Sequence, residues 1–285
     1  MTKNKAEILR QTSELLTAEK IKACLEKAAE ILPGGRVIAA GRTRGGRPIY
    51  ALHAGSAEQA TCYAGGIHGQ EGITSVILLK FLAELTDLTG RNEMIAGIAG
   101  DVYWSRAGLF LLPCLNMDGV ARAEPGWQAN DSGVDLNHNF DAGWELCKQA
   151  ELAQGIIGPG PGRYGGKKPF SEPETRAVKR LCTRRRFLRM IAFHSQGEEI
   201  YGGHGGQTDP ATEAIGELMA KLTGYTYCQP GESAAHGGMK DWFYDQFGRP
   251  AFTMEVGRGC NPLPLEEAGP IYETLRRMLQ VVPLL

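Results

Sequence analysis

The sequence has no long apolar segment and almost no net charge. No apolar run approaches the roughly 20 residues that a membrane-spanning helix needs, and the first residues are charged and amphipathic instead of forming an apolar signal segment. Its 31 Lys and Arg residues are balanced by 32 Asp and Glu residues, which gives a formal net charge of −1. We therefore expect a soluble protein with neither a membrane nor a nucleic acid as partner, because nucleic-acid binding relies on a basic field.

The sequence also lacks paired cysteines and has few histidines. The seven cysteines are scattered, odd in number and form no Cys-x-x-Cys pair, which is typical of a reducing compartment, so we expect a cytoplasmic location. The six histidines stand out in a chain with 38 glycines. With 42% hydrophobic and 22% charged residues, the composition is that of an ordinary globular enzyme. The oligomeric state stays open.

Strand-like and helix-like segments alternate along the 285 residues, without repeats or a linker. The apolar patterns predict strands over 36–41, 48–54, 61–65, 109–115, 187–193 and 250–256. They predict helices over 8–32, 73–85, 171–184, 211–222 and 265–281. This alternation indicates one α/β domain with a mixed, mostly parallel central sheet and helices on both faces. We expect residues 1–34 to form a helical segment that packs on a catalytic domain over 35–285.

Two segments have a more particular interpretation. Residues 119–164 are rich in Gly, Asn, Asp and Pro and show little periodicity, and a long irregular stretch in a compact domain is usually functional. The following helix is predicted to begin with Ser171 as its N-cap and Glu174 three residues later.

Two histidines and a carboxylate stand at the ends of predicted strands. His68 and Glu71 are three residues apart, directly after a strand and at a helix start, which suits a first pair of zinc ligands. His194 leaves another apolar strand and would complete a His₂Glu set with one open position, as in catalytic zinc sites. Taken singly, each histidine could be structural and Glu71 could be helix-start charge. Their joint occurrence within Gly-rich surroundings favours a metal site.

Two further groups could serve such a site. Glu255 lies on an apolar strand, where unpaired burial is costly, so it is either a buried ion-pair partner or the base that takes a proton from the attacking water. Asn137 and His138 lie in the irregular stretch and offer amide and imidazole groups to a polar substrate.

In their order and strand contexts, these segments resemble the zinc carboxypeptidase family. The resemblance covers about residues 50–281 and rests on the motifs Gly-Gly-Ile-His-Gly-Gln-Glu (65–71), Leu-Asn-Met-Asp-Gly (115–119), Gly-Val-Asp-Leu-Asn-His-Asn-Phe (133–140), Pro-Phe-Ser-Glu-Pro-Glu-Thr (169–175), Phe-His-Ser-Gln-Gly (193–197), Gly-Gly-Met-Lys-Asp-Trp (237–242) and Phe-Thr-Met-Glu (252–255). It implies an eight-stranded mixed sheet and one Zn²⁺ per chain bound by His68, Glu71 and His194. By the same resemblance Glu255 is the general base and the later proton donor.

Three departures from the family pattern bear on the substrate. Family exopeptidases have an arginine where this chain has His138, and an imidazole cannot offer the bidentate fork that holds a terminal carboxylate, so C-terminal trimming of proteins is not expected. The oxyanion arginine has no clear counterpart, and Arg122 is either a substitute or surface charge. His236 occupies the place given to a family tyrosine, as a lid group that donates a hydrogen bond or as an exposed loop histidine.

Within the family, residues 194–198 and 237–243 are most similar to the γ-D-glutamyl-L-diamino acid peptidases and murein peptide amidases. This resemblance implies a small peptide substrate with several carboxylates, cleaved between γ-D-glutamate and meso-diaminopimelate in the cytoplasm. Lys240 is then a carboxylate contact, or else a solvated loop lysine. One alternative is a deacylase of the aspartoacylase and succinylglutamate-desuccinylase type, which acts on N-acyl amino acids. Another is a catalytically silent binding protein that has kept the pocket.

Overall fold

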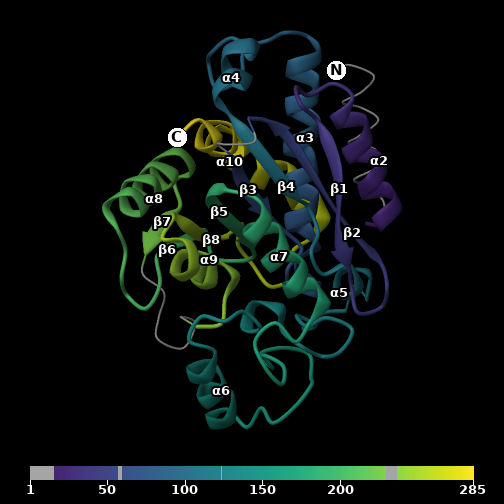
Figure 1. Cartoon of the computed structure of the whole chain (residues 1–285), viewed down its shortest axis with the longest axis vertical. Helices are drawn as coiled ribbons and strands as arrows, with labels where there is room; N and C mark the ends of the chain where they lie inside the picture. Colours follow the sequence, from purple (N-terminus) through teal and green to yellow (C-terminus); the bar gives the residue numbers. More distant parts are fainter. Residues whose placement is uncertain (1–15, 57–59, 123, 229–235) are drawn as a thin grey trace.

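An eight-stranded sheet runs through the centre of the computed structural model, which describes residues 16–56, 60–122, 124–228 and 236–285 (Figure 1). The strands lie in the order β1-β2-β4-β3-β5-β8-β6-β7. Their bounds are β1 Arg36–Arg42, β2 Pro48–Gly55, β3 Ala60–Ala64, β4 Gly108–Leu112, β5 Phe187–His194, β6 Glu199–Gly202, β7 Thr226–Cys228 and β8 Ala251–Glu255.

The middle of the sheet is parallel and its outer parts are mixed. The β4-β3, β3-β5 and β5-β8 pairs are parallel, as is the β6-β7 pair. The β1-β2, β2-β4 and β6-β8 pairs are antiparallel. The expected mixed, mostly parallel sheet is therefore confirmed. Its central strands are buried on both faces, which explains why they read as continuous apolar runs.

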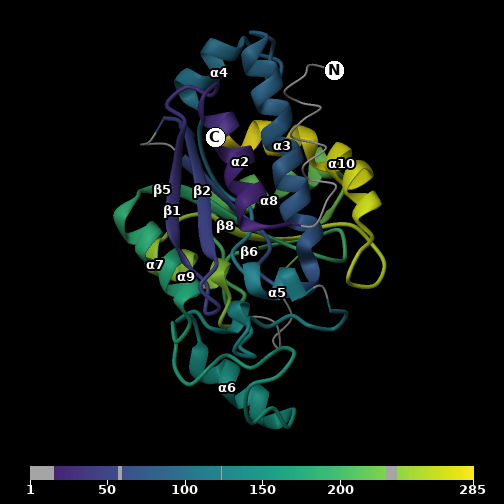
Figure 2. The ribbon, with the colours of Figure 1, turned by 90° about the vertical axis from the view of Figure 1, so that its right-hand side faces the viewer.

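Helices cover both faces of this sheet (Figure 2). One face carries α2 (Ala18–Ala29), α3 (Gly72–Gly90), α8 (Pro210–Thr223) and α10 (Ala268–Val281), and the other carries α7 (Pro173–Arg184) and α9 (Met239–Phe247). Side chains of one strand alternate between the two cores: Tyr63 packs in the first core, whereas its neighbours Cys62 and Ala64 pack in the second. Each core is thus one helical layer against one face of the sheet.

The remaining helices are short. They are α4 (Gly100–Arg106), α5 (Met117–Arg122), α6 (Trp144–Ala153), and the 3₁₀ helices η1 (Gly69–Glu71), η2 (Leu136–His138), η4 (Leu265–Glu267) and η5 (Val282–Leu284). The α6 segment and the loops around it lie below the ends of the strands in Figure 1, beyond the sheet. Among the described residues, no helix combines the length and apolar character needed to span a membrane.

Several predicted elements differ from the observed ones. The N-terminal helix begins at Ala18 within the described residues, and the part predicted over 8–15 lies outside them. Strand β4 ends at Leu112, because Pro113 has no N–H to donate to a neighbouring strand. The stretch 119–164 is not irregular throughout, since it contains α6. This helix was not predicted because its good helix formers occupy a short segment between glycine-rich ones. The patterns did not predict α4, α5, α9, β6 or β7.

The start of α7 is shifted by one residue from its predicted cap. Glu172 is the N-cap and Pro173 occupies the first helical position, where its missing N–H costs nothing. The Ser171 hydroxyl instead donates to the Glu172 carboxylate at 2.9 Å and accepts from the Asn139 side-chain amide, also at 2.9 Å. The predicted cap is wrong because these two partners, one of them distant in the sequence, hold the serine outside the helix.

Candidate active site

Two neighbouring parallel strands deliver three metal-binding side chains to the same edge of the sheet. His194 is the last residue of β5, and His68 follows the end of the adjacent strand β3. Glu71 comes from η1, directly after the histidine. The carboxyl ends of parallel strands are the common place for a ligand in an open α/β sheet. The topology therefore brings together residues that are more than 120 positions apart in the chain.

A glycine makes the loop after β3 possible. The Gly69 N–H donates to the Gln128 carbonyl at 2.9 Å. A Cβ on Gly69 would lie 2.8 Å from the backbone of Gly119 and from the Trp127 carbonyl oxygen, closer than real Cβ atoms come. Only glycine lets the chain pass this close, which fixes the position of the histidine before it and the glutamate after it.

The polar atoms of the three side chains converge on one point. The Nδ1 atom of His194 lies 3.2 Å from Nδ1 of His68 and 3.0 Å from Oε2 of Glu71. The other Glu71 oxygen lies 2.9 Å from Nδ1 of His68. Glu71 and His194 are 2% and 1% exposed, so water does not separate these groups. The predicted set His68, Glu71 and His194 is thus a cluster whose ligand atoms all lie within 4.8 Å of one another.

The cluster has the spacing and chemistry of a zinc site. A tetrahedral ion with bonds of about 2.0–2.1 Å keeps its ligand atoms roughly 3.3 Å apart, close to the 2.9–3.2 Å separations observed. Two imidazole nitrogens face each other here beside a carboxylate. Both nitrogens can bind one cation with their lone pairs, whereas a hydrogen bond between them requires one to be protonated and the other not. The residues present therefore fit Zn²⁺, with a fourth position left for water or substrate.

The electrostatics of the cluster favour a positive charge at its centre. Burial alone would lower the pKa of His68, but the carboxylates of Glu71 and Asp135 outweigh it and raise that pKa well above its usual value. Burial likewise opposes ionisation of Glu71, yet the two histidines bring its pKa down to about 2. The carboxylates are thus held ionised around the point where the imidazole nitrogens meet.

Asp135 contacts the His68 ring on the side away from the cluster, and the sequence analysis did not single it out. Its Oδ1 atom lies 3.1 Å from Nε2 of His68 and accepts the Asn137 N–H at 3.0 Å. Its Oδ2 atom accepts the Arg163 N–H at 2.9 Å. A carboxylate behind a metal-bound histidine fixes the tautomer and the orientation of the ring. The available signal was an acidic residue within the Gly-Val-Asp-Leu-Asn motif of the irregular stretch.

Glu255 stands beside the cluster at the end of β8. Strand register pairs it with His194 of β5 on one side and with Glu199 of β6 on the other. Burial raises its pKa to about 7, against the lowering effect of His194, with a further raising contribution from Glu71. A carboxyl group with a pKa near neutrality can both accept and return a proton at physiological pH.

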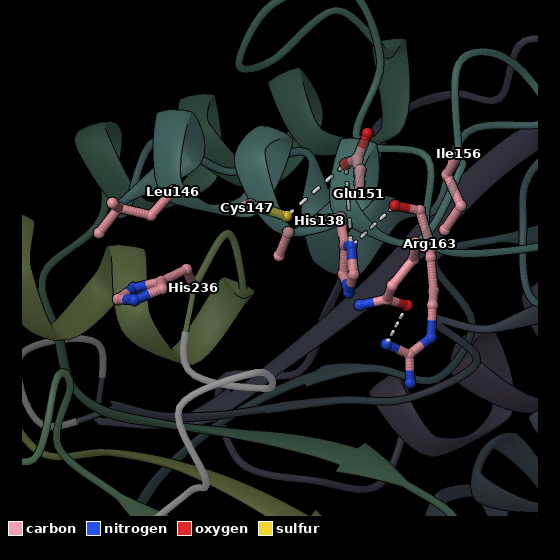
Figure 3. A pocket seen from close by; sticks show the side chains of 9 residues that line it. His138, Leu146, Cys147, Glu151, Ile156, Arg163 and His236 are labelled. Atoms are coloured by element: carbon pink, nitrogen blue, oxygen red, sulfur yellow. Dashed lines mark hydrogen bonds and ion pairs between the residues drawn. The ribbon is translucent and has the colours of Figure 1, made fainter.

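Asn137 and His138 lie on η2, next to Asp135, but their side chains are engaged with the protein. The Asn137 side-chain oxygen accepts the Met239 N–H at 3.1 Å, which ties it to the start of α9. The His138 Nδ1–H donates to the Arg163 carbonyl at 2.9 Å, and the ring lines a small pocket against α6 (Figure 3). Their predicted contacts with substrate stay predictions.

The structure places the other three predicted residues around and beyond this pocket. His236 lies at its far side from Arg163 in Figure 3, with Nδ1 3.2 Å from Nε2 of His204. Lys240 is buried in α9, where its ammonium group donates to the Gly203 carbonyl and pairs with Asp241, so it is not a solvated loop lysine.

Arg122 pairs with Glu124, and its guanidinium carbon lies 3.5 Å from the centre of the Trp127 ring. Its side chain is 43% exposed. These surroundings suit a surface charge, and a contact of Arg122 with substrate remains a prediction.

Comparison with known proteins identifies the family. The sequence profile described as zinc carboxypeptidase matches residues 21–275, nearly the whole chain. The chain belongs to the zinc carboxypeptidase family. Among curated zinc carboxypeptidase relatives, γ-D-glutamyl-L-diamino acid endopeptidase 1 of Lysinibacillus sphaericus is 33% identical over 250 residues, covering 80% of this chain and 62% of the relative. The chain therefore spans about three fifths of the length of that protein.

Two solved structures share the fold. Bovine thrombin-activatable fibrinolysis inhibitor superposes with a TM-score of 0.73 at 22% identity, covering 95% of this chain and 97% of that one. Murein-tripeptide amidase MpaA of Escherichia coli O157 superposes with a TM-score of 0.60 at 22% identity, covering 89% and 93%. These likenesses confirm the zinc carboxypeptidase architecture that the motifs implied.

Proposed function

We propose that this chain is a peptidase that uses one zinc ion to hydrolyse an amide bond in a small, multiply carboxylated peptide. The favoured target is the γ-D-glutamyl–meso-diaminopimelate bond of murein peptides. The observation that carries the proposal is the convergence of His68, Glu71 and His194 beside Glu255 at one edge of the sheet. The names of the Lysinibacillus endopeptidase and of the murein-tripeptide amidase support the choice of substrate class.

The proposed chemistry divides between the ion and the side chains. Zinc, when bound, supplies Lewis-acid activation of the attacking water and of the scissile carbonyl. Glu255 accepts the proton of that water as the new C–O bond forms, and then returns it to the leaving amine as the C–N bond breaks. Its pKa of about 7 suits both transfers. His68 is held in place throughout by Asp135.

The substrate side of the site supports a peptide other than an ordinary protein C-terminus. His138 provides an imidazole where the family exopeptidases have a guanidinium, and imidazole has no bidentate fork for a carboxylate. We propose that Asn137, His138 and His236 contact the substrate. Lys240, buried in α9, would position the start of that helix through its bond to the Gly203 carbonyl. We also propose a cytoplasmic location, since none of the seven cysteines forms a disulfide.

The decisive variant is Glu255→Gln, assayed together with metal content. We expect the variant to keep its zinc and to lose activity by a factor of about 10² to 10⁴, because the amide cannot take the proton. Glu199→Gln, which changes the carboxylate facing Glu255 across the β6-β8 pair, serves as the control and should keep activity within a few-fold. Full activity of Glu255→Gln would exclude this carboxylate as the base.

A substrate panel separates the alternatives. The wild-type protein should cleave γ-D-glutamyl–diaminopimelate peptides faster than N-acyl amino acids in a comparison of kcat/KM. Faster hydrolysis of N-acyl amino acids would favour a deacylase. Zinc-loaded protein without turnover on either class would indicate a binding protein that has kept the fold and the cluster.

A further inference from the structure

Among the described residues, a second cluster of side chains that can bind a metal joins His138 to α6. Cys147 and Glu151 are four residues apart and therefore project from the same face of α6. The Cys147 sulfur lies 3.7 Å from Oε1 of Glu151, and Nδ1 of His138 lies 4.0 Å from the same oxygen. One ligand atom from each of the three residues lies within 4.8 Å of the others. Figure 3 shows the three side chains pointing toward one another.

We propose that His138, Cys147 and Glu151 form a second metal site, which binds a zinc-like ion that accepts sulfur ligands. Cys147 and Glu151 are 5% and 2% exposed, so their ligand atoms are held in place and shielded from bulk water. The pocket that they line with His138 has a volume of about 70 Å³, enough for an ion with a water beside it. Its ligand set shares no residue with the cluster of His68, Glu71 and His194, which contains no sulfur.

The surroundings of Glu151 leave one of its oxygens for an ion. Lys148 pairs with Oε2, which fixes the orientation of the carboxylate. Oε1 accepts the Gly165 N–H at 2.7 Å and still faces Cys147 and His138. A carboxylate oxygen has two lone pairs, so it can accept this N–H and coordinate an ion together.

The distances are close to those around a bound ion. For bonds of about 2.3 Å to sulfur and 2.0–2.1 Å to oxygen and nitrogen, tetrahedral geometry places sulfur and oxygen roughly 3.6 Å apart and nitrogen and oxygen roughly 3.3 Å apart. The observed sulfur–oxygen separation is 3.7 Å, and the nitrogen–oxygen separation of 4.0 Å must shorten through a turn of the His138 ring. On binding, Nδ1 releases its bond to the Arg163 carbonyl, the ring proton moves to Nε2, and the thiol proton passes to solvent.

The ligand types select the ion. A thiolate, an imidazole and a carboxylate suit Zn²⁺ and Cd²⁺, whereas Mg²⁺ and Ca²⁺ prefer oxygen ligands alone. A bound ion would cross-link α6 to η2, and thereby hold the segment that carries both His138 and Asp135.

Cadmium titration tests the site through the ultraviolet charge-transfer absorption of a Cd²⁺–thiolate bond. The full chain with Cys260→Ser is the parent, because Cys260 is exposed and would add background. We expect one thiolate-bound Cd²⁺ per chain, loss of the band in Cys147→Ala, and retention in the matched control Cys182→Ala, which removes another buried cysteine. His138→Ala and Glu151→Gln should weaken the binding at least tenfold. Absence of the band in the parent, or its survival in Cys147→Ala, would overturn this proposal. Neither result would bear on the catalytic zinc, because of the two clusters found among the described residues only this one contains sulfur.

Discussion

At the scale of single residues, the candidate site consists of the cluster His68, Glu71 and His194 and of Asp135, whose carboxylate lies 3.1 Å from the His68 ring. The sequence alone allowed the cluster to be predicted, but not Asp135. His68, Glu71 and His194 could be selected because each follows an apolar segment and each is a zinc-ligand type. Asp135 could not, because an acidic residue in a glycine-rich loop is common and nothing in the sequence tells which ring it faces. The positions of His138 and His236 could not be predicted from the sequence either, since both depend on how the segment with α6 folds.

The hydrogen bond between Asp135 and His68 makes a prediction about metal affinity. In Asp135→Asn the amide keeps the size of the side chain but loses the charge that orients the ring 3.1 Å away. We expect zinc affinity to fall about 10- to 100-fold, as measured by competition with a chromophoric chelator. Asp141→Asn, an exposed change six residues further along, is the control. An unchanged affinity in Asp135→Asn would show that the strand ends alone orient His68.

At the scale of elements, α7 shows where local patterns stop being informative. Its Ser-x-x-Glu start is the usual sequence of a capping box, yet Glu174 turns inward, away from the cap. Its Oε1 accepts the Arg44 N–H from the β1-β2 hairpin at 2.9 Å, and Glu172 accepts the Asn130 side-chain amide, also at 2.9 Å. Both partners are distant in sequence, so tertiary contacts decide what the two carboxylates do.

The burial of Glu174 predicts a pH dependence of stability. Burial raises its pKa from the ordinary 4.5 to about 7, with a further contribution from Glu172. Between these two pH values the folded chain holds a proton that the unfolded chain has released. This group's contribution therefore makes the free energy of unfolding fall as pH rises from about 4.5 to 7. Two to three pH units correspond to about 3 kcal/mol.

Glu174→Gln should remove that contribution. Compared with wild type, the variant should gain stability at pH 8 relative to pH 5, by up to about 3 kcal/mol, in urea unfolding at both pH values. Glu145→Gln, an exposed change in the first turn of α6, should show no such difference. A pH-independent effect of Glu174→Gln would mean that hydrogen bonds, and not the buried charge, govern this position.

At the scale of the whole molecule, the centre of the sheet was predictable and its edge was not. Strands β3, β4 and β5 are buried on both faces, and their sequences are therefore nearly continuous apolar runs. Strand β8 is buried except for the half-buried Thr253 and Glu255, and its apolar residues also made it predictable. Strands β6 and β7 have only four and three residues, too few to show a period. The order of the strands follows from long-range pairing, which a single sequence does not display. The family resemblance supplied the number of strands that periodicity could not.

The position of the proposed zinc ligands predicts that metal removal lowers the stability of the entire fold. The ligands come from the ends of β3 and β5, two central strands in contact with both cores, so an ion held there stabilises only the folded chain. At a free zinc concentration roughly 1,000-fold above Kd, binding contributes about 4 kcal/mol, and chelation should lower Tm by about 7 °C. Glu71→Gln should start from the lower Tm and respond little to a chelator. Cys147→Ala should keep the full shift of the catalytic ion, which separates the two metal sites. An identical Tm of wild-type protein with and without chelator, at confirmed zinc loss, would contradict the coupling between this cluster and the sheet.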